Sequence, residues 1–192
     1  MCQRNHICNV AKGCFFKLHN TFKIRKCITD EAAKTMVNSM ITSKLDYCNS
    51  IFCALPDCSL KSLSSVQKTA LLLIGTKRYE LITPVIPNLH WLPIRRRIMY
   101  NILVLTLKCL LGTAPGYLVD LLQKRHNKRT RDDDRNFLVI PKVKRSTFAG
   151  RSFSFASATL WNRLPDDLSL TTDIDVFKKQ LKSYIFSLSY QL

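Results

Sequence analysis

Three consecutive carboxylates, Asp132, Asp133 and Asp134, are the residues of this chain that could support phosphoryl transfer. Two-metal phosphoryl transfer needs carboxylates that hold two cations about 4 Å apart on a rigid support. No apolar strand precedes the triplet, and lysines and arginines surround it on both sides. This pattern is typical of a solvated charge run, so we predict no catalytic residue here.

The cysteines and histidines offer thiol and imidazole chemistry. Cys48, Cys53 and Cys58 recur every five residues, and with His90 they could surround a metal ion. A five-residue spacing drifts around a helix, however, and the chain lacks the paired Cys-x-x-Cys units of a structural zinc site. No serine or cysteine stands in a nucleophile motif near any histidine. We therefore predict no metal site, no cofactor, no small-molecule substrate and no enzymatic activity.

The net charge of the chain indicates an anionic partner. The 192 residues include 30 Lys and Arg against 13 Asp and Glu, which gives a net charge of +17. This excess is larger than solubility requires, and nucleic acid is the commonest partner of such a chain. The apolar stretch 98–111 is too short and too interrupted to span a membrane, which takes roughly 20 residues. We predict sequence-nonspecific binding to RNA, DNA or both, and no membrane partner.

Two basic clusters are the candidate nucleic-acid contacts. Arg95, Arg96 and Arg97 lie in the first turn of a predicted helix, where positive charge opposes the helix dipole. An anionic ligand would explain them, and simple solvation of the helix would explain them equally well. Region 123–151 carries ten basic residues against three aspartates, and they are Lys124, Arg125, Lys128, Arg129, Arg131, Arg135, Lys142, Lys144, Arg145 and Arg151.

Two further interpretations concern these basic residues. A nuclear-localisation signal within 124–131 is an alternative to phosphate binding. The first predicted helix adds a second basic stripe, made of Lys12, Lys17, Lys23, Arg25 and Lys26. Nothing in either cluster indicates readout of base edges, so we expect phosphate contacts that weaken steeply with salt.

Apolar periodicity predicts a mainly α fold that must position these charges. Regions 5–25, 29–55 and 57–75 each repeat apolar residues at three- and four-residue spacing, which predicts a bundle of three helices. A further helix is predicted from Pro93 to Gly112, after a proline-rich connector. The expected inner face of the first helix consists of Ile7, Val10, Ala11, Cys14, Leu18 and Phe22.

The same patterns predict how the chain is divided. Region 1–80 is the helical bundle, 81–122 holds the connector and helices, 123–136 is a charged linker, and 137–192 is a small C-terminal domain. Within that last domain, 137–140 and 143–148 predict a β-hairpin, followed by two helices. The N-terminus lacks the apolar run of a secretory signal. We therefore expect an intracellular protein, nuclear or cytoplasmic and not secreted, whose cysteines are mostly buried thiols.

Six ordered motifs carry a resemblance to a known family. The chain resembles, almost end to end, the region after the polymerase palm in non-LTR (LINE-type) retrotransposon reverse transcriptases of the jockey and chicken-repeat group. The motifs are Thr42-Ser-Lys-Leu-Asp-Tyr-Cys-Asn-Ser50, Ala54-Leu-Pro56, Val66-Gln67, His90-Trp-Leu-Pro-Ile94, Ala114-Pro-Gly-Tyr-Leu118 and Leu160-Trp-Asn-Arg-Leu-Pro165.

The resemblance implies that 5–76 corresponds to the helical thumb that grips a template–primer duplex, and that the remainder is accessory. The Tyr-x-Asp-Asp hairpin of the palm and the endonuclease would lie upstream of Met1, so no catalytic residue is carried over. The predicted function is a non-catalytic fragment that binds nucleic acid, while the full-length parent would be an RNA-directed DNA polymerase. A protein-interaction scaffold and a product without selected function are the alternatives, and the sequence leaves the oligomeric state open.

Overall fold

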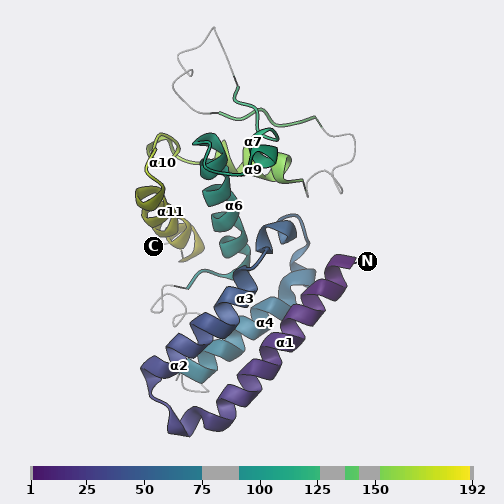
Figure 1. The fold of residues 1–192 in the computed structure, drawn as a ribbon, viewed down its shortest axis with the longest axis vertical. Helices are drawn as coiled ribbons and strands as arrows, with labels where there is room; N and C mark the ends of the chain where they lie inside the picture. The colour runs from purple at the N-terminus through teal and green to yellow at the C-terminus, as the bar shows by residue number, and fades with distance from the viewer. Residues whose placement is uncertain (1, 75–90, 126–136, 143–151, 191–192) are drawn as a thin grey trace. The chain divides into compact units, whose positions relative to one another are not determined.

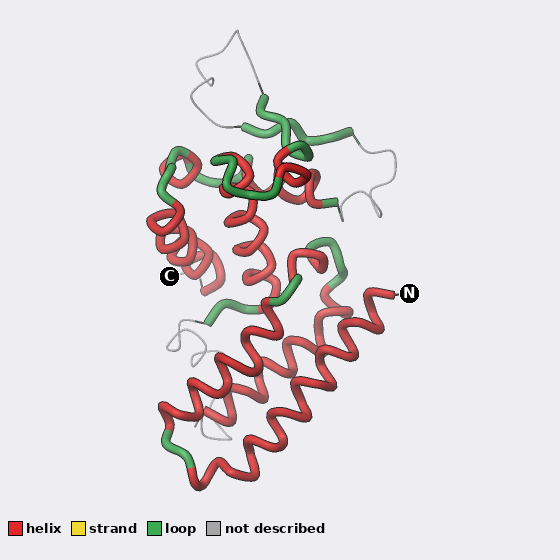
Figure 2. Tube along the Cα trace, in the orientation of Figure 1, coloured by secondary structure: helices red, strands yellow, loops and turns green. Residues whose placement is uncertain are grey.

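The computed structural model describes residues 2–74, 91–125, 137–142 and 152–190, which belong to two compact units (Figure 1). Unit 1 comprises Met1–Asn49 and Leu55–Arg97, and unit 2 comprises Ser50–Ala54 and Ile98–Leu192. The described residues are mostly helical and contain no strand (Figure 2), which confirms the mainly α prediction. The predicted boundary at residue 80 and most of the predicted linker 123–136 lie outside the described residues.

Unit 1 contains the three predicted helical regions. In chain order its elements are α1 (Cys2–Ile24), η1 (Arg25–Cys27), α2 (Asp30–Val37), η2 (Asn38–Thr42), α3 (Ser43–Asp46) and α4 (Asp57–Ile74). The elements α2, η2 and α3 follow one another without a break, and the turn η3 (Asn49–Phe52) leads on from them. Both α1 and α2 pack against α4. The helices predicted over 5–25, 29–55 and 57–75 are therefore present, and the second ends at Asp46.

Local chemistry explains where the second helical region begins and ends. The hydroxyl of Thr29 accepts a hydrogen bond of 3.3 Å from the backbone nitrogen of Ala32, which satisfies one free donor of the first turn. The negative charges of Asp30 and Glu31 in that turn stabilise the helix, because its N-terminal end carries the positive pole of the helix dipole. Two residues after α3, Cys48 has a φ of 53°, in the left-handed region that turns the chain away from the helix.

The core of unit 1 follows a 3.5-residue repeat along α1. Ile7, Ala11, Cys14 and Leu18 are at most 4% exposed, as predicted for the inner face. The next buried position is Thr21, at 6% exposure, whereas Phe22 is 40% exposed. The prediction that Phe22 faces inward was wrong because the buried positions alternate steps of four and three residues, which selects position 21.

Among the described residues, unit 2 holds most of one long helix, whose first four residues belong to unit 1, and four further helices. Its elements are α6 (Ile94–Leu110), α7 (Gly116–Val119), α9 (Phe153–Trp161), α10 (Asp166–Ser169) and α11 (Ile174–Tyr190). Gly112 has a φ of +69° and ends α6, as its sequence position predicted. The buried ring of Trp161 lies 5.8 Å from that of Phe177, centroid to centroid, which joins α9 to α11 in the core.

The predicted β-hairpin over 137–148 is not found in the described residues. Leu138 instead forms an isolated antiparallel bridge with Lys124, and the backbone nitrogen of Val139 donates a 2.8 Å hydrogen bond to the carbonyl of Gln123. On the other side, the carboxamide of Asn162 pairs with both backbone groups of Leu138, at 2.9 Å each. The segment thus has partners at 123–125 and at Asn162, while its predicted partner 143–148 lies outside the described residues.

Candidate nucleic-acid interface

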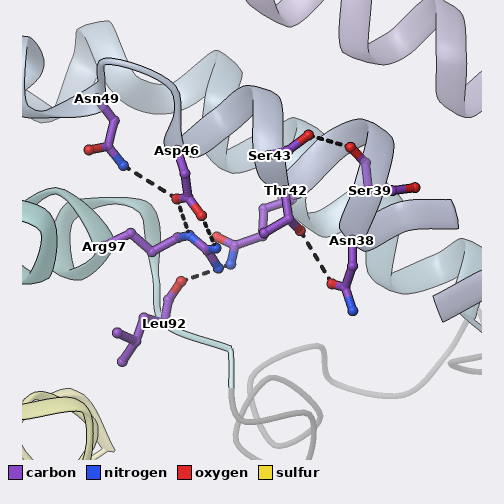
Figure 3. A network of polar contacts seen from close by, with 9 residues as sticks. Asn38, Ser39, Thr42, Ser43, Asp46, Asn49, Leu92 and Arg97 are labelled. Carbon is purple, nitrogen blue, oxygen red and sulfur yellow. Dashed lines mark hydrogen bonds and ion pairs between the residues drawn. The ribbon is translucent and has the colours of Figure 1, made fainter. Parts of the chain in front are cut away.

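Arg97, in the first turn of α6, is held by a carboxylate from α3 (Figure 3). Its Nε donates a 2.8 Å hydrogen bond to Oδ1 of Asp46, and its Nη2 donates a 2.6 Å hydrogen bond to Oδ2. Nδ2 of Asn49 donates a further, longer hydrogen bond of 3.4 Å to the same carboxylate. The guanidinium matches the carboxylate in the two-point geometry that makes such pairs strong. The Arg97 side chain is 17% exposed, so the pair is partly shielded from water.

Arg95 makes a similar but more exposed contact within unit 1. Its Nε and Nη2 donate to Oδ1 of Asp57 at 3.0 and 2.5 Å, and Nη2 also donates to the carbonyl of Leu55 at 2.8 Å. Arg96, between the two, is half-buried. Arg95 and Arg97 each pair with a carboxylate of unit 1. Contact of these arginines with an external anion stays a prediction.

Arg25, a member of the predicted basic stripe, also serves the fold. Its Nε donates a 2.7 Å hydrogen bond to the carbonyl of Leu73 near the end of α4, and its Nη1 donates to the carbonyl of Ile28 at 3.0 Å. Its Nη2 forms an ion pair with Asp30 at the start of α2. One guanidinium thus connects the end of α4 to the turn between α1 and α2.

These three arginines change the charge balance of unit 1. The described residues of unit 1 include thirteen Lys and Arg and four Asp and Glu. Three of those four acids, Asp30, Asp46 and Asp57, are engaged by the arginines just described, and Glu31 is the fourth. The remaining positive charge is carried mainly by lysines.

The lysines of unit 1 are distributed over its outer surface. Among the described residues, no lysine of unit 1 forms an ion pair. The exposed basic side chains of the unit come from α1, η1, α2 and α4, and they are Arg4, Lys12, Lys23, Lys26, Lys34, Lys61 and Lys68. Lys17 and Lys44 are partly covered. These cations are free to meet an anion of extended shape.

The sequence interpretation missed part of this surface. It singled out Lys12, Lys23 and Lys26 but not Lys34, Lys61 and Lys68. The available signal was the helical period itself, because in α2 and α4 these lysines occur at positions off the buried stripe.

Unit 2 contributes fewer described candidates. Lys124, Arg125 and Lys142 of the predicted cluster are exposed, whereas Lys128, Arg129, Lys144, Arg145 and Arg151 lie outside the described residues. The described part of unit 2 holds eight basic against five acidic residues, so its excess is small. One of these cations is partnered, since a 2.9 Å hydrogen bond from Lys178 holds the pKa of Asp175 below its ordinary value.

Several residues of the sequence motifs make contacts that hold the fold. The buried Gln67 on α4 donates a 2.9 Å hydrogen bond to the carbonyl of Leu92, which ties two motifs together. Asp46 and Asn49 belong to a third motif, in which Asn49 donates to Asp46 and Asp46 binds Arg97. Asn162, which binds Leu138, belongs to a fourth. Such hydrogen bonds satisfy buried polar groups, which explains these residue types without a ligand.

A pocket of about 460 Å³ opens in unit 1 between α1 and the first turns of α4. Its lining includes the polar residues Arg4, Ser59, Lys61 and Ser62, whose types suit an anion. Cys8 and Cys58, both exposed free thiols, also line it. Within the described residues no three His, Cys, Asp or Glu side chains gather closely enough to hold a metal ion, and His90 lies outside them.

In the described part of the chain, no helix combines the length and the apolar character needed to cross a membrane. No protein-family model, curated protein or solved structure matches this chain. What the protein binds is therefore inferred from its own charges and contacts.

Proposed function

We propose that this protein is a non-catalytic nucleic-acid-binding chain whose unit 1 lysines contact phosphates of RNA or DNA without reading sequence. The observation that carries the proposal is that, in the described part of unit 1, arginines pair with the acids while the lysines form no ion pair. Arginines engage three of the four described acids, so the lysines have almost no internal counter-charge. A polyanion that neutralises them releases condensed counterions, which is the main source of nonspecific binding.

The chemistry of arginine and lysine side chains suits these different roles. The planar guanidinium of arginine matches a carboxylate at two points, so Arg25, Arg95 and Arg97 are suited to fixed internal pairs. A lysine ammonium is a mobile point charge that follows a phosphate backbone of variable geometry. Lys12, Lys23 and Lys26 are the leading contacts, and Lys124, Arg125 and Lys142 are secondary ones in unit 2.

The family resemblance supports the same proposal. A helical bundle formed by α1 to α4 is consistent with the helical thumb expected for the C-terminal region of a non-LTR retrotransposon reverse transcriptase. In that case the polymerase carboxylates would belong to a longer parent, and this chain would act inside the cell by holding a template–primer duplex. The resemblance supplies no catalytic residue for this chain, in line with the expectation that it is not an enzyme.

The test is fluorescence-anisotropy binding of the full chain to a labelled RNA–DNA hybrid, repeated from low to physiological salt. We expect submicromolar binding at low salt and a steep salt slope. The variant Lys12→Gln/Lys23→Gln/Lys26→Gln should lower that slope by about 2 to 3, because each phosphate that a lysine neutralises contributes about 0.9. A control variant, Lys179→Gln/Lys182→Gln, removes exposed lysines of α11 in unit 2 and should change the slope less.

Two results would count against the proposal. A folded wild-type chain that binds no nucleic acid at low salt would refute it. An equal decrease of the slope per lysine removed, in the triple variant and in the α11 control, would show that net charge, and not the unit 1 surface, determines binding.

A protein-binding scaffold is the second candidate function. It is favoured by large apolar side chains of unit 2 that are exposed in the structure, since Tyr117 is 70% exposed, Leu170 52% and Leu121 48%. Salt-sensitive binding to an acidic protein, with no binding to RNA or DNA in the same assay, would favour the scaffold.

A further inference from the structure

The solvent side of α1 carries a stripe in which two lysines flank two aromatic rings. Lys12, Phe16, His19 and Lys23, here called the α1 stripe, follow one another at steps of four, three and four residues. These steps place the side chains in one line along the helix, over about 16 Å. All four side chains are exposed, on the side of the helix away from the buried stripe.

The rings of the stripe are not needed by the core of unit 1. Phe16 is 67% exposed, and the neighbouring Phe15 and Phe22 are 38% and 40% exposed. The inner face of α1 is already filled by the buried residues from Ile7 to Thr21. Phe15 and Phe22 lie roughly 100–120° around the helix from Phe16 and next to the buried positions, so Phe16 is the phenyl ring that stands among the lysines on the exposed side.

The charges around the rings restrict what can cover them. The first 29 residues of the chain contain no aspartate or glutamate, so no acid on α1 offsets Lys12 or Lys23. Two copies that met by this same stripe would place lysines against lysines. A partner of opposite charge that also offers flat apolar faces complements both parts of the stripe.

We infer that the α1 stripe binds single-stranded nucleic acid, with Phe16 stacked on a base and Lys12 and Lys23 contacting the flanking phosphates. In a duplex the base faces are covered by their neighbours, whereas in a single strand they are open to an aromatic ring. Cations beside the ring add attraction to the phosphates on either side of the stacked base. This inference rests on the proposed function and names the strand form and the residues that would recognise it.

The test compares a labelled single-stranded RNA with the same RNA paired to complementary DNA, using the full chain. Phe16→Ala should weaken single-strand binding roughly five- to a hundred-fold and leave duplex binding within about two-fold. The control Tyr117→Ala removes a ring that is 70% exposed on α7, where no lysine accompanies it, and should leave single-strand binding unchanged. Phe16→Trp should keep the affinity, and its added fluorescence should be quenched by the single strand.

The outcomes separate this inference from the proposed function. Wild-type single-strand affinity in Phe16→Ala, together with weakened binding in Lys12→Gln/Lys23→Gln, would overturn the inference and leave the proposed function standing. Absence of binding to either RNA form would overturn both. An equal decrease of affinity in Phe16→Ala and Tyr117→Ala would also overturn the inference, because it would show that any exposed ring contributes.

Discussion

Arg97 and Asp46 are joined by two hydrogen bonds, of 2.8 and 2.6 Å, across 51 positions of the chain. The pair connects the first turn of α6 to the end of α3 within unit 1. The Asp46 carboxylate supplies the negative charge that pairs with this partly buried arginine. The first prediction tests that structural role.

Replacing Arg97 by glutamine should destabilise unit 1. The change leaves Asp46, whose side chain is 35% exposed, without its charged partner, and we expect a decrease of about 1–3 kcal/mol in the free energy of unfolding. Urea unfolding measures this decrease. Arg95→Gln is the matched control, because its partner Asp57 is 85% exposed, and it should cost under about 1 kcal/mol. Equal destabilisation of the two variants would contradict the structural role assigned to Arg97.

The stability of the folded chain should rise with added salt. The lysines of unit 1 have little internal counter-charge and repel one another, and salt screens that repulsion over about 10 Å at 0.1 M. Lys12→Gln/Lys23→Gln/Lys26→Gln should show a smaller salt effect and a Tm equal to or above that of the wild type. Thermal unfolding between low and physiological salt measures the salt effect and the Tm of both proteins. A wild-type Tm that falls as salt is added would contradict the inference that the unit 1 lysines repel one another.

Asn162→Ala should loosen the segment around Leu138 in unit 2. The carboxamide of Asn162 satisfies the backbone nitrogen and carbonyl of the buried Leu138, at 2.9 Å each. Leaving both groups unpaired should cost about 2–4 kcal/mol. Asn162→Asp keeps one acceptor and should cost less than the alanine variant. Hydrogen exchange at the Leu138 amide measures the effect. Unchanged protection of this amide in Asn162→Ala would contradict the role of the Asn162 carboxamide in holding the Leu138 backbone.

The cysteines should divide into fast and slow classes towards an alkylating reagent. Cys8, Cys27, Cys48 and Cys58 are exposed, whereas Cys14 and Cys109 are 0% and 3% exposed. Burial raises the pKa of the Cys14 and Cys109 thiols above their ordinary value, so little reactive thiolate forms in the folded chain near pH 8. Mass spectrometry after timed labelling should find Cys14 and Cys109 modified only on unfolding. Labelling of Cys14 as fast as Cys8 would contradict the packing of α1.

The same two thiols predict a pH effect on stability. Their folded pKa is raised, so the unfolded chain loses these protons first as pH rises. The two thiols therefore make their full contribution to the free energy of unfolding below the ordinary thiol pKa. That contribution decreases as pH rises from the ordinary pKa towards the folded pKa. The free energy of unfolding should decrease from pH 7 to pH 10. In Cys14→Ala/Cys109→Ala, the decrease from the value that this variant has at pH 7 should be smaller than in the wild type.

Cys48→Gly should stabilise unit 1. Cys48 has a φ of 53°, and the left-handed region costs a residue with a β-carbon roughly 1–2 kcal/mol. Glycine removes that cost but gains flexibility when unfolded, so we expect a net gain of about 0.5–1 kcal/mol. Cys48→Ala removes the thiol but keeps the β-carbon and should show no such gain. Equal stability of the two variants in urea would indicate that the backbone at this position carries no strain.

The helices could be predicted because their signals are local. The caps at Thr29 and Asp173 and the end at Gly112 follow from single residues and their neighbours. The inner face of α1 was predicted only in part, since Phe22 and Thr21 lie 100° apart on the helix and sequence hydrophobicity favoured the phenylalanine. Contact with the neighbouring helices selected position 21.

The candidate site depended far more on long-range contacts. Arg95, Arg96 and Arg97 formed one of the two basic clusters singled out in the sequence, and two of them bind Asp57 and Asp46. Arg97 and Asp46 are 51 residues apart, so the sequence around either residue does not indicate that they pair. The segment 137–140 likewise has β-branched residues typical of a strand, but its partners are 123–125 and Asn162.

By itself the sequence determined the positive excess of the chain and the positions of the helical regions, because charge and helical period depend on residue type and local spacing. Only the tertiary structure decided which cations are available to a ligand. An arginine within reach of a carboxylate forms a short-range pair whose energy depends on angle and distance, and chain folding alone determines that geometry. The exposed lysines and Phe16 remain on the surface because the core of unit 1 is complete without them.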